Sequence, residues 1–295
     1  MQDGVNSEEL DELIGTVLSN VYEIHSTIAK GSTSKIYKAR NKFVEKYVAV
    51  KLLNAELAKS PMALKRFQFE AQVTCSIAHP GIVATHDFGF TESGRPYLIL
   101  ELLDGKTLSK QLADSGPMPA QTARDLFQQL CNTLQHCHSK GVIHRGLNPG
   151  DIILLSANGN KSKFSSKIID FGIAKRLWLP EAIKDAQLVP VPEIIGSPLY
   201  MSPEQRLAQS VDARSDVYAL GCVMYEVLVG RPPFSGENLT ELHQKHIHDQ
   251  PISPSNATSG LSIPGSLESV ILKALQKEPA SRYQSMSEIL HALSK

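Results

Sequence analysis

Three charged positions in this sequence have the residue types and settings needed to hold a charged ligand. Asp151 ends the stretch His144-Arg145-Gly146-Leu147-Asn148-Pro149-Gly150-Asp151, and Asp170 directly follows a short apolar run. Carboxylate oxygens are hard ligands of the kind that Mg²⁺ prefers. Lys51 lies in a β-branched, apolar run that begins at Tyr47. What these side chains can do depends on the elements that position them.

The first hundred residues are predicted to form mainly strands. Their apolar runs are short, rich in β-branched residues and separated by turn residues such as Ser93-Gly94, a pattern typical of strands. Pro61 precedes an amphipathic segment, which predicts one helix among them. The expected strands cover residues 22–29, 35–40, 47–53, 82–90 and 96–100, and the helix covers residues 61–78.

After residue 102 the periodicity becomes helical. Apolar residues recur on one face of a long segment that stops at Gly141, and a nearly all-apolar segment ends at Gly230, as expected for a buried helix. Two short strands are expected at residues 152–155 and 167–169. The expected helices cover residues 121–140, 215–229, 267–275 and 286–293.

Residues 1–20 contain five acidic residues and neither Lys nor Arg. Leu10, Leu13, Ile14, Val17 and Leu18 recur at helical spacing, which predicts a short helix in an acidic N-terminal extension. Such a helix would either pack on the following domain or dock a partner protein, and the sequence favours neither outcome decisively.

The composition is that of an ordinary globular protein. Of the 295 residues, 42% are hydrophobic and 20% are charged, and 30 basic side chains balance 30 acidic ones. This balance gives no reason to expect binding to nucleic acid or to an anionic membrane. The longest apolar run contains Glu226 and is too short to span a bilayer. The four cysteines form no CxxC pair, so we expect reduced thiols and a cytoplasmic location.

The motifs together resemble the eukaryotic-type Ser/Thr protein kinases, including their bacterial members, over residues 21–295. The resemblance rests on four motifs that occur in the family's order: Val48-Ala49-Val50-Lys51, the loop at residues 144–151, Asp170-Phe171-Gly172 and the segment from Gly196 to Glu204. The resemblance implies an α+β, two-lobed kinase-like fold. A small N-lobe of five strands and one helix would cover residues 21–102, and a larger, mainly helical C-lobe would cover residues 103–295.

The resemblance also implies a site for ATP. Lys51 would contact the α- and β-phosphates and pair with Glu70, and Asp170 would bind Mg²⁺. Asp216 would fix the backbone of the loop at residues 144–151, and Arg282 would pair with Glu204. The residues expected to bind the nucleotide are Ala29, Gly31, Ala49, Lys51, Glu70, Glu101, Ile153 and Asp170, and those expected to bind the metal are Asp151 and Asp170.

The glycine-rich loop departs from the family pattern G-x-G-x-x-G. It aligns with Ala29-Lys30-Gly31-Ser32-Thr33-Ser34, in which Gly31 alone remains. Glycines in this loop let backbone N–H groups approach phosphates closely. We therefore expect weakened rather than abolished nucleotide binding.

The loop at residues 144–151 departs further from its pattern, H-R-D-x-K-P-x-N. His144 and Arg145 remain, but Gly146 stands at the position of the Asp that accepts the substrate's proton. Asn148 replaces the Lys and supplies no charge, and Asp151 replaces the Asn but keeps an oxygen for Mg²⁺. No residue of this loop is thus a certain catalytic residue.

The activation segment gives an independent indication. Between Phe171 and Gly196 there is no Ser, Thr or Tyr, so this span cannot be switched by phosphorylation.

Three hypotheses follow. The first is a regulatory pseudokinase that binds ATP weakly, with or without Mg²⁺, and acts on a protein partner that the sequence does not identify. The second is an active but slow Ser/Thr kinase that aligns its acceptor through an unusual group such as Asp151. The third is a kinase-like fold that binds no nucleotide.

Overall fold

The computed structural model describes residues 13–156, 165–171, 175–176, 197–258 and 262–295. The chain forms two compact units. The first comprises described residues up to Ala71 together with Ala84–Leu103, and the second comprises Gln72–Val83 and the chain from Asp104 onward. The predicted α+β class, with a sheet-based part and a mainly helical part, is confirmed, whereas the lobe boundaries at residues 21–102 and 103–295 stay a prediction.

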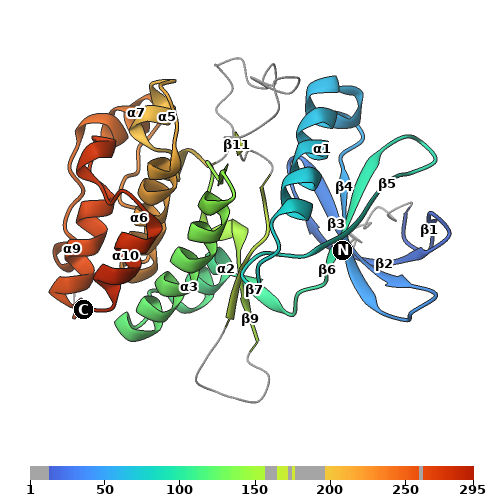
Figure 1. Cartoon of the computed structure of the whole chain (residues 1–295), viewed down its shortest axis with the longest axis horizontal. Helices are drawn as coiled ribbons and strands as arrows, with labels where there is room; N and C mark the ends of the chain where they lie inside the picture. Colours follow the sequence, from blue (N-terminus) through green and yellow to red (C-terminus); the bar gives the residue numbers. More distant parts are fainter. Residues whose placement is uncertain (1–12, 157–164, 172–174, 177–196, 259–261) are drawn as a thin grey trace, which may run out of the picture. The chain divides into compact units, whose positions relative to one another are not determined.

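The first unit is built on a six-stranded antiparallel sheet in the order β1-β2-β3-β4-β6-β5 (Figure 1). One face carries the apolar core, in which Ile24, Val50 and Ile99 are at most 2% exposed. The strands are β1 Val17–Leu18, β2 Tyr22–Lys30, β3 Ser34–Asn41, β4 Tyr47–Leu53, β5 Thr85–Phe90 and β6 Pro96–Glu101. Helix α1, Pro61–Ser76, begins in this unit after the 3₁₀ turn Leu57–Lys59.

Strand β1 corrects part of the N-terminal prediction. The helix expected over residues 1–20 does not include Val17 and Leu18, which pair with Glu23 and Tyr22 of β2 instead. Gly15, Ser19 and Asn20 all have positive φ, a conformation that a right-handed helix excludes. The backbone of this segment is satisfied by β2, because Gly15 N–H donates to Ile24 O at 2.8 Å. Residues 1–12 lie outside the described part of the chain.

The second unit is mainly helical. Its helices are α2 Leu108–Ser115, α3 Ala120–Ser139, α5 Pro203–Arg206, α6 Ala213–Val229, α7 Leu239–His248, α8 Pro254–Ala257, α9 Gly265–Ala274 and α10 Met286–Leu293. Its short strands are β7 Gly105–Thr107, β8 Val142–Ile143, β9 Ile152–Leu155, β10 Ser165–Ile168 and β11 Lys175–Arg176. Its 3₁₀ turns are Pro149–Asp151, Pro198–Tyr200 and Pro279–Ser281.

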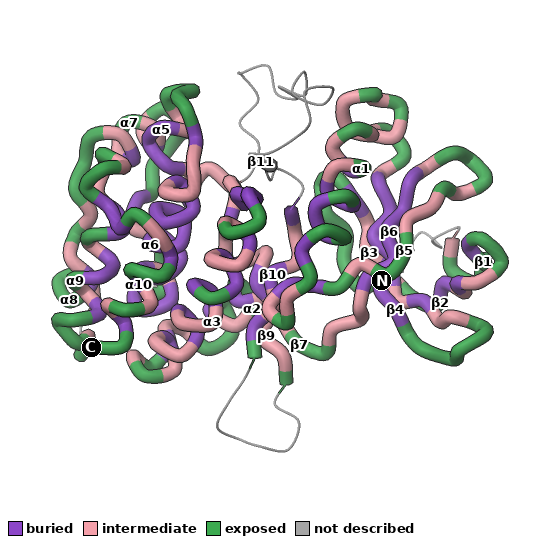
Figure 2. Tube along the Cα trace, viewed as in Figure 1, coloured by how far each residue is buried: buried purple, intermediate pink, exposed green. Residues whose placement is uncertain are grey.

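Helix α6 is the centre of this unit. Figure 2 shows it as an almost continuous run of buried residues, as its apolar sequence predicts. It contacts α3 and α9, and α10 packs on α3. Asp212 caps its N-terminus by accepting a hydrogen bond from Arg214 N, and Gly230 ends it with φ 83°. A buried helix of this kind is a rigid support for polar side chains that it carries, among them Asp216.

Among the residues that the structure describes, no helix combines the length and the apolar character needed to cross a membrane.

Candidate functional site

The turn between β2 and β3 carries the remnant of the glycine-rich loop. Ala29 lies on β2, and Gly31 lies in the turn, where its N–H donates to Ser34 O at 2.9 Å. A Cβ on Gly31 would lie 3.1 Å from that oxygen, so a larger residue would have to displace it. Asn54 closes the turn by donating to Gly31 O at 3.2 Å and to Ser32 O at 2.9 Å. Hydrogen bonds within the turn and from Asn54 therefore hold the turn, although it lacks two of the three glycines of the family pattern.

Lys51 and Glu70 form the predicted ion pair. Lys51 Nζ lies 2.5 Å from Glu70 Oε1, and the two side chains are only 8% and 5% exposed. β4 presents Lys51, and α1 presents Glu70. A buried pair fixes the position of the ammonium group and so prepares it for an anionic ligand. That it binds a nucleotide remains a prediction.

Ala49 and Glu101, both expected to bind the nucleotide, lie on the neighbouring strands β4 and β6. Ala49 of β4 is opposite Leu100 of β6, and both are buried. Glu101 ends β6, and its backbone N–H already donates to Ala84 O at 2.9 Å. The backbone group that Glu101 would offer a ligand is therefore its carbonyl oxygen.

In the second unit, Asp216 holds the backbone of the loop at residues 144–151, as predicted. Its carboxylate accepts hydrogen bonds from His144 N at 2.9 Å and from Arg145 N at 2.8 Å. His138 Nε2 lies 2.7 Å from the same carboxylate. Burial raises the pKa of Asp216, but the hydrogen bond and charge of His138 and the contacts with His144 outweigh it. The net pKa lies below the ordinary value, so the carboxyl group is ionised and able to accept at neutral pH.

Arg145 has a strained backbone that is held from both sides. Its φ of 70° is in the left-handed region, which non-glycine residues adopt rarely. Asp216 fixes its N–H, and Gln205 Nε2 donates to its carbonyl oxygen at 2.6 Å. Such strain persists only where the surroundings fix it.

Gln205 was not predicted as a site residue, although its sequence context contains a usable signal. The segment Ser202-Pro203-Glu204-Gln205 has the spacing of a capping box. Gln205 Oε1 accepts hydrogen bonds from Ser202 N at 3.1 Å and from Ser202 Oγ at 2.9 Å. That capping role leaves its amide nitrogen to donate to the loop.

The three residues that replace the family's Asp, Lys and Asn, namely Gly146, Asn148 and Asp151, are linked to one another by hydrogen bonds. Asn148 Nδ2 donates to Gly146 O at 3.1 Å and, through a short hydrogen bond, to Asp151 Oδ2. Asn148 Oδ1 accepts from Gly150 N at 2.8 Å. The polar groups of Asn148 are thus committed within the loop, and Gly146 contributes only its backbone.

Asp170 follows β10, and the residue between them is hydrogen-bonded to the loop at residues 144–151. Ile169 N–H donates to Asp151 O at 2.9 Å, and the preceding strands β9 and β10 pair Ile153 with Lys167. Phe171 is fully buried, with its ring centroid 4.9 Å from that of His144. Burial lowers the pKa of His144 despite the nearby charges of Asp216 and Asp170, so its imidazole is neutral. Gly172 lies outside the described residues, as does most of the activation segment.

The carboxylates of Asp151 and Asp170 are chemically suited to Mg²⁺. Both supply hard oxygen donors, and Mg²⁺ often binds through one or two carboxylates together with waters and phosphates. In the part of the chain that the structure describes, no three His, Cys, Asp or Glu side chains form a metal cluster. A cation bound here would therefore depend on ligands that come with the nucleotide.

Glu204 and Arg282 form the predicted buried ion pair. Arg282 Nη1 and Nη2 donate to the two carboxylate oxygens of Glu204 at 2.8 and 2.7 Å. Ser215 Oγ adds a hydrogen bond to Glu204. This bidentate contact joins α5 to the chain before α10 and supports the segment from which Gln205 reaches the loop.

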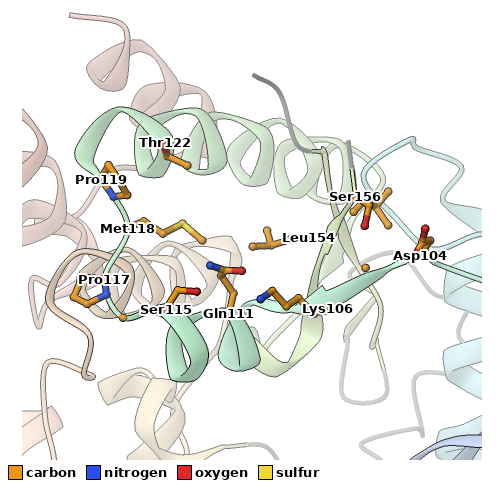
Figure 3. A pocket seen from close by; sticks show the side chains of 13 residues that line it. Asp104, Lys106, Gln111, Ser115, Pro117, Met118, Pro119, Thr122, Leu154 and Ser156 are labelled. Atoms are coloured by element: carbon orange, nitrogen blue, oxygen red, sulfur yellow. The ribbon is translucent and has the colours of Figure 1, made fainter. Parts of the chain in front are cut away.

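The second unit also contains an open groove of about 730 Å³ that involves none of the predicted site residues (Figure 3). Met118 and Leu154 lie along it with Gln111 of α2 and Thr122 of α3. Ile153 does not line the groove, whereas the next two residues of β9 do. The groove is therefore separate from the predicted adenine contact.

Comparison with known proteins agrees with this geometry. A model of the protein kinase domain matches residues 22–293. The serine/threonine-protein kinase PknB of Mycobacterium leprae is 40% identical over 276 residues, which is 92% of this chain and 42% of that protein. PknB of Mycobacterium tuberculosis is 39% identical over 277 residues, and PknB of Mycolicibacterium smegmatis is 37% identical over 275, with the same shares covered.

These three relatives are longer proteins, of which this chain spans 42%. The match of the family model and the kinase relatives lead to one conclusion. The chain belongs to the protein kinase domain family, in its eukaryotic-type Ser/Thr kinase group.

Proposed function

We propose that this protein is a pseudokinase, which binds ATP and acts through contact with another protein instead of transferring phosphate. The observation that carries the proposal is the set formed by Gly146, Asn148 and Asp151. Gly146 offers no carboxylate to accept the proton of an attacking hydroxyl, and Asn148 turns its amide into the loop. Loss of general-base help alone removes about 10²–10⁴-fold in rate. Loss of nucleophile alignment adds to this, because phosphoryl transfer depends on positioning.

Retention of ATP is supported by residues that the altered loop does not affect. The buried Lys51–Glu70 pair presents an ammonium group for the phosphates, and Asp170 and Asp151 would hold Mg²⁺. When bound, Mg²⁺ would neutralise phosphate charge. Ala49 and Ile153 would contact the adenine ring, with the carbonyl of Glu101 as a hydrogen-bond acceptor. The replacement of two glycines beside Gly31 is expected to weaken this binding.

The partner would be a protein, and the place of action the cytoplasm, where ATP is available. Cys131, Cys137 and Cys222 are buried free thiols, which suits a reducing compartment.

A slow Ser/Thr kinase is the second candidate, favoured by the activity named for the relatives. Asp151 would then have to replace the missing base. The hydrogen bond from Asn148 opposes this role, because a bond donated to a carboxylate stabilises its charged form and makes it a weaker base. A third candidate, a kinase-like fold that binds no nucleotide, is disfavoured by the buried Lys51–Glu70 pair, which keeps an ammonium group in place for phosphates.

Two measurements separate these candidates. Thermal unfolding with and without ATP, in EDTA and in Mg²⁺, should show a rise in midpoint, because a ligand of the folded state stabilises it. If the midpoint rises in neither condition, the third candidate, a kinase-like fold that binds no nucleotide, would be supported. Transfer from γ-labelled ATP to a generic protein acceptor should stay at background level.

Lys51→Ala and Asp170→Asn are the controls for transfer, and two are needed because loss of Lys51 also destabilises the protein. Transfer that is robust and lost in both variants would overturn the pseudokinase proposal. The triple variant Gly146→Asp, Asn148→Lys, Asp151→Asn rebuilds the family pattern. It should gain measurable transfer from the same ATP.

A further inference from the structure

The side chain of Asn148 makes three hydrogen bonds, all to its own loop. Its amide nitrogen donates to Gly146 O and to Asp151 Oδ2, and its oxygen accepts from Gly150 N. The last bond caps the 3₁₀ turn Pro149–Asp151. The residue is half-buried, so these bonds are partly shielded from water.

Few side chains can satisfy these three partners together. The task needs two donors and one acceptor, which an amide supplies. A lysine at position 148 has donors but no acceptor, and would leave Gly150 N–H without its cap. An ionised aspartate at position 151 accepts but cannot donate, so it cannot serve Gly146 O itself. In the family pattern the amide stands at 151 and the lysine at 148, whereas here the amide stands at 148.

Gly150 provides an independent indication that this closure is built into the loop. A Cβ at this position would lie 2.9 Å from Asn148 Oδ1, closer than real Cβ contacts. A residue larger than glycine at position 150 would therefore push the Asn148 side chain away from its present position.

We propose that Asn148 is the positioning residue of this loop, and that the replacements at 148 and 151 act as one exchange. The amide lost from position 151 is supplied from position 148. There it fixes the carboxylate of Asp151 and the carbonyl of Gly146.

The consequence concerns Mg²⁺ and rests on the proposed binding of ATP. Asp151 is held through its side chain by Asn148, and its backbone carbonyl accepts from Ile169 N, next to Asp170. Both carboxylates thus belong to one hydrogen-bonded frame. Removing a residue that orients a metal ligand typically lowers metal affinity by about 10–100-fold.

The test is the Mg²⁺ dependence of the thermal midpoint at fixed ATP, measured on the whole chain. Asn148→Ala should raise the Mg²⁺ concentration at half-effect by about 10-fold or more, while the shift with ATP in EDTA stays unchanged. Gly150→Ala, which removes no polar group, should act in the same direction. Asn148→Lys should be impaired, and Asn148→Lys with Asp151→Asn should recover most of that loss.

Asn238→Ala is the matched control. Asn238 also caps a helix, accepting from Glu241 N at 2.9 Å, but that helix is α7, and this hydrogen bond does not involve the loop at residues 144–151. Its loss should lower the midpoint of the unliganded protein without changing the Mg²⁺ half-effect concentration. An unchanged half-effect in Asn148→Ala, or a double variant no better than Asn148→Lys, would overturn the proposal.

Hydrogen exchange separates this proposal from the proposed function. Asn148→Ala should accelerate exchange of the Gly150 amide at least several-fold, whether or not ATP binds. If the wild type shows no ATP-dependent shift of the thermal midpoint, the proposed function fails. The rate of hydrogen exchange at Gly150 still tests whether Asn148 positions the loop. Unaltered exchange at Gly150 would count against it.

Discussion

Lys51 and Glu70 place opposite charges in the interior of the first unit, with side chains 8% and 5% exposed. Taking two charges out of water costs several kcal/mol, which their attraction offsets only while both are present. The pair is therefore a weak source of stability but a strong constraint on position. This constraint is what a phosphate-binding ammonium group needs.

Lys51→Met should destabilise the protein by about 3–5 kcal/mol, because it removes the ammonium group whose charge offsets that of the buried Glu70 carboxylate. Lys51→Met with Glu70→Leu should recover most of this loss, since an apolar pair pays no desolvation cost. Denaturant unfolding followed by circular dichroism measures both. A double variant as unstable as the single one would show that the charge imbalance is not the cause.

The sequence predicted the paired residues better than it predicted the direction of single side chains. The Lys51–Glu70 and Glu204–Arg282 pairs are confirmed, because each partner stands in a motif with a known order. The inward turn of Asn148 was not foreseen. Its bonds depend on where a 3₁₀ turn places Gly150 N–H and Asp151, which residue types alone do not specify.

At the scale of elements, long periodic segments were predicted closely and short ones less well. Helix α10 has the predicted bounds, and α6 begins two residues before its predicted start. Strand β5 begins at Thr85 rather than Ile82, because Ile82 belongs to the second unit and bridges there to Ile168. The segment before β2 misled the prediction, because the spacing of apolar residues does not reveal the positive φ values of Gly15, Ser19 and Asn20 that exclude a helix there.

Helix α5 has a function that its length of four residues conceals, namely to hold the loop through Gln205. Gln205→Glu keeps the oxygen that accepts from Ser202 but replaces the donor to Arg145 O with a second acceptor. We expect a loss of about 1–3 kcal/mol in stability, the cost of an unsatisfied buried group. Hydrogen exchange at Gly146 should accelerate.

Ser202→Ala is the control for this element, because it leaves the Gln205 amide nitrogen intact. It should lower stability without the same effect at Gly146. Acidification should partly rescue Gln205→Glu, because a protonated carboxyl group can donate to Arg145 O. Exchange at Gly146 equal to that of the wild type would show that Asp216 alone fixes the loop.

For the whole molecule, the stability carried by buried acids should depend on pH. Burial raises the pKa of Glu204, but the hydrogen bonds and charge of Arg282, with the bond from Ser215, outweigh it. The net pKa is lowered, as it is for Asp216. A carboxyl group whose pKa is lower in the folded than in the unfolded protein contributes stability above its unfolded pKa. That contribution is lost as the pH falls through the folded value.

The free energy of unfolding should therefore be highest near neutral pH. It should begin to fall below about 6.5, the ordinary histidine pKa, because the pKa of buried His144 is lowered and its imidazole takes up a proton on unfolding. It should fall further below about 4, the ordinary carboxyl pKa, where these carboxyl groups lose their contribution. Each pKa unit of lowering contributes about 1.4 kcal/mol of this loss. Glu204→Gln should reduce stability at pH 7, since Arg282 loses its charged partner, and should flatten the decline in acid because one titrating group is gone. Denaturant midpoints measured between about pH 7 and pH 3 test this. A decline as steep in Glu204→Gln as in the wild type would assign the acid sensitivity to other carboxylates, with Asp216 the next to examine.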